Sequence, residues 1–548
     1  MDLRTLTSLP SRIPGNPIGR VLDGAFAVKV LTERGILEPA RPDKLARMAA
    51  LYLRWGNSPA TAAAIDAVRC PDDAYVEDEE GELTYAEVEA RSNALARALR
   101  DEGVSEGDGL GVMARNHRGF VDATLASAKL GCSTLYLNTQ FSAPQLSDVM
   151  EREGPTALIY DQEFAGLLEG IPDDIKRFAS QSEKDAPDEK STEDMISSSS
   201  DEPLDPPSEE PRFVILTSGT TGTPKGAQRK PPSGLGSFAS LLDVMPFQSG
   251  EKMMIAAPLF HSWGFTHLIL SLALHSSIVL RGKFDPEETL KATQESGAQV
   301  LAVVPVMMQR IMQLDDKTLS KYELPDLRIT SVSGSALPGE LATAWMDRFG
   351  DNIYNLYGST EVAYATIATP EDLREAPGTA GKAPRGTVVR IVDDECNDVE
   401  QGQSGRIFVG NEMAFEGYTG GGNKEALGDL LSSGDIGHFD DEGRLFIDGR
   451  DDEMIVSGGE NVFPREVEDL LADHDKVKEA AVIGVDDEEW GQRLKAFVVL
   501  NDGGNVSEDD IKSYVKKNLA KYKVPREVEF LDSLPRNATG KVLKRELT

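Results

Sequence analysis

Leu216-Thr217-Ser218-Gly219-Thr220-Thr221-Gly222-Thr223-Pro224-Lys225-Gly226 is the stretch that decides the fold. It follows Phe213-Val214-Ile215, a β-branched and aromatic run that predicts a strand. Glycine lets backbone N–H groups face an anion without a Cβ in the way, hydroxyl side chains add donors, and Lys225 adds a positive charge. We therefore expect a polyphosphate-binding loop where a strand ends. Its spacing is not that of the Walker loop, and the closing Pro-Lys-Gly disfavours the alternative of a flexible linker.

The composition is that of a large globular protein whose charge limits its partners. The chain has 548 residues, of which 40% are hydrophobic and 27% charged, and its net charge is −35. This acidity disfavours nucleic acid and anionic membranes as constant partners and fits a cytoplasmic protein, although a high-salt environment would also explain it. The three cysteines are far apart and form no Cys-x-x-Cys pair, which argues against structural zinc and disulfides.

No segment predicts insertion into a membrane. Residues 1–20 lack the apolar core of a signal peptide, and the most apolar later run, 268–280, is interrupted by polar residues. Residues 21–53 predict two short amphipathic helices, which either cap a domain edge or make a peripheral contact with a membrane or a protein partner. The pattern leaves the oligomeric state open, with a homodimer as one option.

Short strands and helices alternate in the first part of the chain. Thr84 and Glu87 form a capping box that starts a helix, and Gly103 stops it. This rhythm predicts βαβ units and a parallel sheet. The expected strands are 110–113, 133–137 and 157–160, and the expected helices between them are 123–130 and 145–151.

Three later segments differ in character. Residues 181–211 are acidic and rich in Ser and Pro, which predicts a solvated, mobile loop to which we assign no function. Short, turn-bounded strands between residues 388 and 447 predict a small β-rich subdomain. From Pro464 onward, two helices and three strands predict a compact α+β unit. Its end is locally basic, which indicates either an exposed lysine face or a surface that meets a polyanion.

Six further stretches carry the polar and small residues of a nucleotide site, in the order 258–264, 333–337, 354–361, 433–437, 448–461 and 535–541. With the loop 216–226 they resemble the motifs of the adenylate-forming (ANL) superfamily, which contains acyl-CoA synthetases, luciferases and peptide-synthetase adenylation domains. The resemblance extends from Leu83 to Lys541. It implies a large α/β N-terminal domain at 1–449, with parallel sheets flanked by helices and a small β-rich subdomain. A hinge at 450–453 and a small mobile α+β C-terminal domain at 454–548 complete the expected fold.

The stretch Tyr354-Asn355-Leu356-Tyr357-Gly358-Ser359-Thr360-Glu361 has the clearest nucleotide chemistry. The resemblance implies that Tyr357 lies along adenine, Thr360 meets the α-phosphate and Glu361 binds Mg²⁺, roles that suit an aromatic face, a hydroxyl and a hard carboxylate. Asp435 can accept both ribose hydroxyls, and the resemblance adds Arg450 as a second ribose contact. The implied ligand-binding residues are Thr217, Ser218, Gly219, Thr220, Thr221, Gly222, Lys225, Gly334, Ser335, Ala336, Asn355, Tyr357, Gly358, Asp435, Arg450, Gly458 and Gly459.

Activation of the acid depends on two residues far apart in the chain. His261 resembles the residue that guards the carboxylate pocket, with a buried structural histidine as the alternative. Lys541 resembles the catalytic lysine of adenylation, whose ammonium bridges two anions, with a solvated lysine as the alternative. Asp452 falls at the hinge position. The implied catalytic set is therefore Lys541, His261, Thr360 and Glu361, the last also the metal ligand.

The implied reaction is ATP-dependent conversion of a carboxylic acid to an acyl-adenylate and then to acyl-CoA, with release of pyrophosphate and AMP. The string Glu488-Glu489-Trp490-Gly491-Gln492 is most similar to bacterial fatty acyl-CoA synthetases, so a fatty acid is expected first and an aryl acid second. Acyl-AMP ligases share the first half reaction, and luciferase-like oxidation stays open. Carrier-protein loading in cis is disfavoured because no carrier domain follows Lys541. The presence of Glu361 and Lys541 disfavours a catalytically inactive nucleotide-binding homologue.

The paired glycines Gly458 and Gly459 give a first test of these assignments. They resemble the loop that borders the pantetheine tunnel, where a side chain would block the narrow passage of the thiol. We expect Gly458→Leu to leave pyrophosphate release unchanged and to slow acyl-CoA formation, with each product measured separately. An unchanged second step would remove the tunnel assignment.

Overall fold

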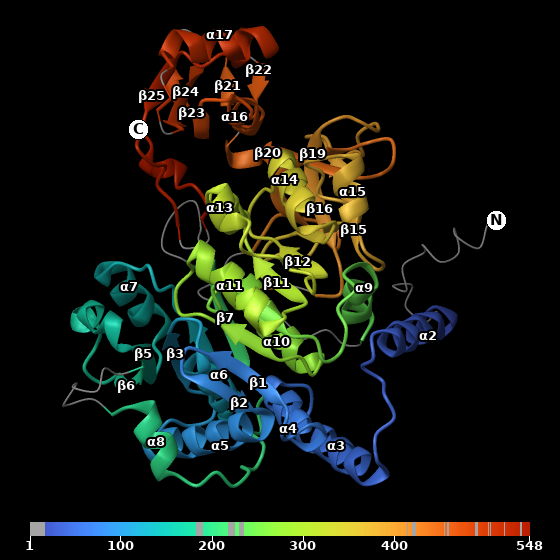
Figure 1. Cartoon of the computed structure of the whole chain (residues 1–548), viewed down its shortest axis with the longest axis vertical. Coiled ribbons are helices and arrows are strands. Elements are labelled where there is room, and N and C mark those ends of the chain that lie inside the picture. The colour runs from blue at the N-terminus through green and yellow to red at the C-terminus, as the bar shows by residue number, and fades with distance from the viewer. Residues whose placement is uncertain are drawn as a thin grey trace. The chain divides into compact units, whose positions relative to one another are not determined.

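The computed structural model describes residues 17–181, 190–217, 225–229, 235–413, 415–418, 423–453, 455–457, 460–487, 491–501, 503–504, 506–519, 521–537 and 540–548 (Figure 1). The chain forms two compact units. The first contains residues 1–333, 345–354 and 412–423, and the second contains residues 334–344, 355–411 and 424–548.

A seven-stranded sheet in the first unit carries the βαβ units that the sequence predicts. Its strand order is β17-β8-β7-β4-β3-β5-β6, and the five strands from β7 to β6 are parallel. The strands are β3 Gly109–Met113, β4 Ser133–Tyr136, β5 Ala157–Asp161, β6 Lys176–Gln181, β7 Arg212–Thr217, β8 Lys225–Arg229 and β17 Phe415–Tyr418. The neighbouring helices are α5 Tyr85–Asp101, α6 Arg118–Leu130, α7 Ala143–Glu153 and the 3₁₀ turn η1 Gln162–Gly170. Helix α6 packs on β3, β4 and β6, so the sheet has an apolar face that a helix covers (Figure 1).

A second, eight-stranded sheet has the order β14-β13-β12-β11-β9-β10-β1-β2. Its strands are β1 Ala74–Asp78, β2 Gly81–Thr84, β9 Met253–Ile255, β10 Ile278–Leu280, β11 Val300–Val303, β12 Ile329–Val332, β13 Ile353–Tyr357 and β14 Thr366–Ala368. The helices in this part of the chain are α9 Gly236–Val244, α10 Ser262–Ala273, α11 Pro286–Ser296, α12 Pro305–Met312, α13 Asp316–Leu319, α14 Gly339–Phe349 and α15 Pro370–Glu375. Strands β9 to β12 are fully buried runs of apolar and small residues, as central parallel strands require.

In the described part of the chain, the helices before the sheets are α2 Pro17–Glu33, α3 Pro42–Trp55 and α4 Pro59–Arg69. The prediction of two helices over 21–53 is confirmed by α2 and α3. Helix α2 packs against α9, and α3 packs against α4 while burying none of its own residues. In the part of the chain that the structure describes, no helix is long and apolar enough to cross a membrane.

The predicted helix start at Thr84 is confirmed. The Thr84 backbone N–H donates to Glu87 Oε2 at 2.7 Å, and the Glu87 N–H donates back to the Thr84 hydroxyl at 3.2 Å. This capping box satisfies two N–H groups that the first turn of α5 would otherwise leave without a partner. Ser507 and Asp510 form the same box at the start of α17.

The prediction of a loop throughout residues 181–211 is wrong for one segment. Residues 192–198 form the helix α8 Thr192–Ser198, in which Thr192 and Met195 are buried. The Ser191 hydroxyl caps it by accepting from the Glu193 N–H at 3.1 Å, and Glu193 forms an ion pair with Arg91 of α5. Composition alone missed this helix, because one cap, two buried side chains and an ion pair outweigh its acidic surroundings.

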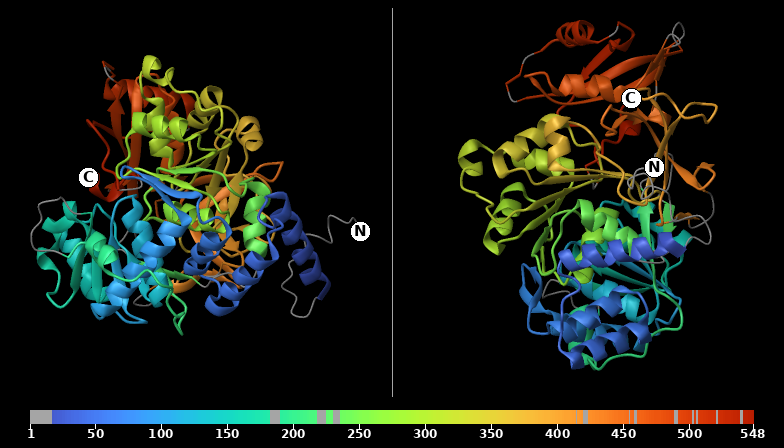
Figure 2. Two further views of the ribbon diagram at one scale, coloured as in Figure 1. Left: turned by 60° about the horizontal axis from the view of Figure 1, so that its bottom comes forward. Right: turned by 90° about the vertical axis from the view of Figure 1, so that its right-hand side faces the viewer.

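The second unit contains two smaller sheets. The order β15-β16-β19-β18, with β20 beside β19, confirms the β-rich subdomain. The next sheet has the order β22-β21-β24-β23, with β25 beside β24. It lies in the orange to red part of the ribbon in Figure 2. The bounds are β15 Val388–Val392, β16 Gly405–Gly410, β18 Ala426–Leu427, β19 Leu430–Phe439, β20 Leu445–Arg450, η2 Asp451–Glu453, β21 Ile455–Ser457, β22 Glu460–Val462, α16 Pro464–Ala472, β23 Val477–Asp487, β24 Gly491–Leu500, α17 Glu508–Asn518, η3 Lys521–Lys523, β25 Glu527–Phe530 and η4 Lys544–Glu546.

The C-terminal sheet has its own apolar core. Val467 and Leu471 of α16 and Ile511 and Val515 of α17 are fully buried against β23 and β24. The fold class predicted from the sequence, a large α/β part with a small α+β part after it, is confirmed.

Candidate active site

The glycine-rich loop connects two antiparallel strands. Thr217 ends β7, Lys225 begins β8, and these two residues lie opposite each other in the ladder. The strand predicted before the loop is confirmed. Ser218, Gly219, Thr220, Thr221 and Gly222 lie outside the described residues.

His261 lies at the start of α10, a helix pressed closely against the segment before it. His261 is the N-cap residue, and its backbone N–H donates to the Pro258 carbonyl at 3.0 Å. A Cβ on Gly264 would lie 2.2 Å from the same carbonyl oxygen, so only glycine fits there. The His261 ring packs against Phe260 with ring centroids 5.6 Å apart.

Trp263 belongs to the core of the first unit. Its indole N–H lies 3.1 Å from the Val303 carbonyl of β11 and 3.3 Å from the Ser331 carbonyl of β12. The His267 ring stacks edge-on against it and is fully buried. One His267 ring nitrogen lies 2.9 Å from the Trp263 carbonyl and the other 2.9 Å from the Ser331 hydroxyl, an arrangement that satisfies a neutral imidazole.

Burial keeps both histidines neutral. It lowers the pKa of His261 and of His267 from 6.5 to about 4. His261 keeps part of its surface exposed, whereas His267 has no exposed surface. At neutral pH His261 therefore offers a hydrogen bond and no positive charge.

In the second unit, residues 358–364 form a turn with a built-in orientation for Glu361. The Ser359 hydroxyl donates to Glu361 Oε2 at 2.9 Å, and the Asn411 amide donates to the carbonyls of Val362 and Tyr364 at 2.8 and 2.9 Å. A Cβ on Gly358 would lie 2.0 Å from the Ala363 carbonyl oxygen, so the turn requires glycine there. Ser359 and Asn411 were absent from the predicted site, because their contacts follow from the turn and from a distant loop.

The other small residues of the predicted site follow strand ends. Gly334 comes two residues after β12 and has φ +96°, a left-handed conformation that glycine adopts without strain. Ser335 is half-buried, Ala336 is exposed, and Asn355 is buried within β13. Thr360 is half-buried in the turn beside Glu361.

Tyr357 and Arg450, two other residues of the predicted site, contact the carboxylate of Asp435. The Tyr357 hydroxyl donates to Asp435 Oδ2 at 2.5 Å, and Arg450 Nη1 lies 3.9 Å from Oδ1. Asp435 and Arg450 are directly opposite each other on β19 and β20. Burial raises the pKa of Asp435, while the Tyr357 hydroxyl and the positive charges of Arg450 and Lys541 oppose that rise. The same burial and carboxylate raise the pKa of Tyr357, so its hydroxyl stays a donor.

The residues of the hinge and the lysine segment are partly described. Asp452 lies in the 3₁₀ turn η2, and Gly458 and Gly459 lie outside the described residues. Lys541 follows a tight turn in which its N–H donates to Asn537 Oδ1 at 2.8 Å and its carbonyl accepts from the Asn537 N–H at 2.9 Å.

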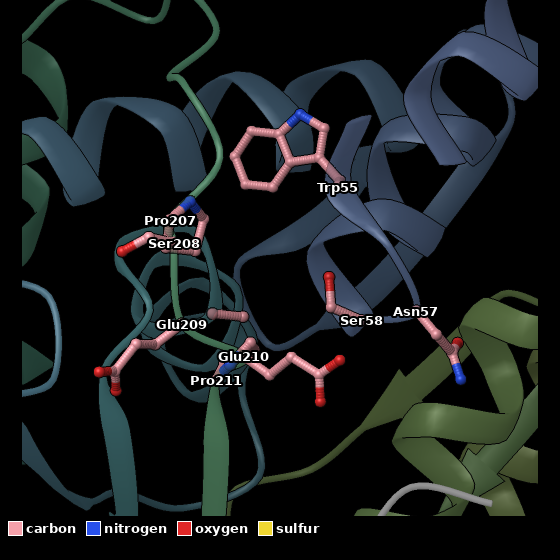
Figure 3. A pocket seen from close by; sticks show the side chains of 9 residues that line it. Trp55, Asn57, Ser58, Pro207, Ser208, Glu209, Glu210 and Pro211 are labelled. Carbon is pink, nitrogen blue, oxygen red and sulfur yellow. The ribbon is translucent and has the colours of Figure 1, made fainter. Parts of the chain in front are cut away.

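No group of three or more His, Cys, Asp or Glu residues in the described ranges could hold a metal ion by itself. One carboxylate suits a Mg²⁺ ion that takes its other ligands from phosphates and water, and the orientation of Glu361 by Ser359 fits that use. A surface pocket in the first unit lies between Trp55, Asn57 and Ser58 on one side and residues 207–211 on the other (Figure 3). None of the predicted site residues lines this pocket.

Residues 64–419 match the family described as "AMP-binding enzyme", and residues 466–541 match "AMP-binding enzyme C-terminal domain". The chain belongs to the AMP-binding enzyme family. This confirms the adenylate-forming relationship that the sequence motifs indicated.

Relatives in this family are CoA ligases for chemically different acids. A feruloyl-CoA synthase from Amycolatopsis is 32% identical over 474 residues, which cover 85% of this chain and 93% of that protein. The long-chain-fatty-acid–CoA ligase FadD13 of Mycobacterium tuberculosis is 30% identical over 492 residues, which cover 86% and 94%. The crystal structure of the anthranilate CoA ligase AuaEII with anthranoyl-AMP has a TM-score of 0.80 at 26% identity, covering 90% of this chain and 96% of that one. The predicted enzyme class, an AMP-forming acid–thiol ligase, is confirmed.

The buried His267 predicts a dependence of stability on pH. Its pKa is about 4 when folded and 6.5 in its ordinary state, so between these values the unfolded chain binds more protons. Its contribution to the free energy of unfolding is complete above pH 6.5 and is lost as the pH falls toward 4. The loss reaches about 2 kcal/mol at pH 5.

We expect the urea midpoint of His267→Asn to fall less between pH 7 and pH 5 than that of the wild type, because asparagine does not titrate there. The variant also starts from a lower midpoint at pH 7, since a buried ring has been removed. Equal falls in the two proteins would contradict the neutral assignment.

Proposed function

We propose that this enzyme activates a carboxylic acid with ATP to an acyl-adenylate and then transfers the acyl group to the thiol of CoA. In the first step a carboxylate oxygen attacks the α-phosphorus and pyrophosphate leaves. In the second step the thiol sulfur attacks the acyl carbon, its proton is released, and AMP leaves. The observation that carries the proposal is the meeting of Tyr357, Arg450 and the charge of Lys541 at Asp435.

The nucleotide roles follow from the chemistry of these groups. We assign the ribose hydroxyls to Asp435, because carboxylate oxygens accept hydrogen bonds and the charges of Arg450 and Lys541 favour the charged form. Tyr357 presents a ring to adenine while its hydroxyl holds Asp435 in place. Thr360 donates to the α-phosphate. The backbone of residues 217–225 holds the β- and γ-phosphates.

Glu361 is the residue that would hold Mg²⁺, with Ser359 orienting its carboxylate. When bound, Mg²⁺ neutralises charge on the phosphate oxygens. The acid lies beside His261, whose neutral imidazole supplies a hydrogen bond and leaves the positive charge to Lys541. Lys541 offsets the repulsion between the attacking carboxylate and the phosphate.

Lys541 is needed only for the first step, so the enzyme requires a change of conformation between the two. We assign the change to rotation of residues 454–548 about Asp452, which withdraws Lys541 and presents Gly458 and Gly459 to the thiol. The short 3₁₀ turn η2, between the sheet that ends with β20 and the sheet that begins with β21, supports this position for the hinge.

The first candidate for the acid is a medium- or long-chain fatty acid, and the second candidate is an aryl acid. The fatty-acid preference rests on the similarity at 488–492, and the feruloyl-CoA and anthranilate relatives support the aryl alternative. A panel of saturated C6 to C18 acids, ferulate, benzoate and anthranilate with ATP and CoA tests both, with acyl-CoA detected by mass spectrometry. Acyl-adenylate without acyl-CoA from every acid would favour an acyl-AMP ligase, and neither product would favour an inactive nucleotide-binding homologue.

Lys541→Ala separates the two half reactions. We expect adenylate formation to fall about 100- to 1,000-fold, the range for loss of one group that stabilises charge in the transition state. Conversion of supplied acyl-adenylate to acyl-CoA should be unchanged. The matched control is Lys517→Ala, which removes an exposed lysine of α17 and should alter neither step. Equal loss in both steps would refute the role of Lys541.

A further inference from the structure

Three residues after Lys541, Lys544 lies between two carboxylates. Its Nζ is 3.0 Å from Glu453 Oε2 and 2.9 Å from Glu468 Oε1. Glu453 is the last residue of η2, which contains Asp452, and Glu468 lies in the middle of α16. The Lys544 ammonium therefore links the last residue of η2, helix α16 and the segment that carries Lys541.

The Glu468 carboxylate is itself held in place. Its Oε1 accepts from the Val482 N–H of β23 at 2.6 Å. The two carboxylates raise the pKa of Lys544 against the opposing effect of burial, so the ammonium stays charged. Because Lys544 is only 20% exposed, water screens these ion pairs less than it would screen pairs on the surface.

The other end of the lysine segment is fixed by Arg536. Its Nη2 lies 2.9 Å from Glu479 Oε2 on β23, and its Nη1 donates to the Gly540 carbonyl. Arg536 also pairs with Val542 as an isolated antiparallel bridge. Lys541 is thus held between two anchored points, one at Arg536 and one at Lys544.

We propose that Lys544 is a positioning residue for Lys541. It ties the segment that carries Lys541 to Glu453, so that Lys541 keeps a fixed position relative to Glu453 when the hinge rotates. This inference rests on the proposed function of Lys541 and Asp452. A lysine side chain is long and flexible, so its accuracy depends on how firmly its backbone is held. A misplacement of about 1 Å can cost about 100-fold in rate, which makes such an anchor worth having.

Two sets of substitutions remove the anchor without leaving an isolated buried charge. Glu453→Gln breaks the link to the hinge and leaves the Lys544–Glu468 pair intact. The double variant Lys544→Met, Glu468→Gln removes both charges and keeps an acceptor for the Val482 N–H. Glu466→Gln is the matched control, because Glu466 is on the same helix and its ion pair with Lys523 does not involve the lysine segment.

The readouts are pyrophosphate release, conversion of supplied acyl-adenylate to acyl-CoA, and the thermal midpoint. We expect Glu453→Gln and the double variant to lower kcat for pyrophosphate release by at least about tenfold, with KM for ATP unchanged. The second half reaction should proceed at the wild-type rate. Glu453→Gln should also unfold at the same temperature as Glu466→Gln.

Pyrophosphate release as fast as in Glu466→Gln would overturn the inference, and so would equal losses in both half reactions. Lys541→Ala, measured in parallel, distinguishes failure of the positioning role of Lys544 from failure of the proposed role of Lys541. If Lys541→Ala separates the half reactions and the anchor variants do not, only the role of Lys544 fails. If Lys541→Ala does not separate them, the proposed function of Lys541 fails and the positioning role fails with it.

Discussion

The hydrogen bond and the ion pair of the Asp435 carboxylate join predicted nucleotide-binding residues of the second unit. Burial raises the pKa of this group, and Tyr357, Arg450 and Lys541 oppose that rise from three different segments of the chain. Each of these three residues is positioned by its local backbone structure. Tyr357 ends β13, Arg450 lies opposite Asp435 in a β-ladder, and Lys541 follows a turn closed by Asn537.

Much of the fold could be predicted because its signals are local. The capping box at Thr84, the strand before the glycine-rich loop and the α+β pattern after Pro464 all depend on residues a few positions apart. Helix α8 could not be predicted from composition, since its two buried side chains and its ion pair with Arg91 involve residues far away in the chain. The same distinction applies to the site. Motif spacing identified Asp435 and Arg450 separately, whereas their direct opposition is a property of strand register.

The residues that hold the site residues were the hardest to foresee. Ser359, Asn411, Arg536 and Lys544 have side chains that are common in turns and on surfaces, and nothing in their spacing marks them. Their contacts exist only after distant segments have folded together. Sequence motifs therefore indicate candidate ligand-binding groups more readily than the groups that orient them.

Trp263 illustrates what this means for changing the acid preference of the enzyme. Its indole N–H is shared by the carbonyls of two adjacent strands, and its ring packs against a buried histidine. Replacing it with a smaller residue would leave a void and remove a hydrogen-bond donor from both strands. An enlarged cavity would therefore destabilise the sheet. Directed evolution toward bulkier acids should therefore leave Trp263 unchanged.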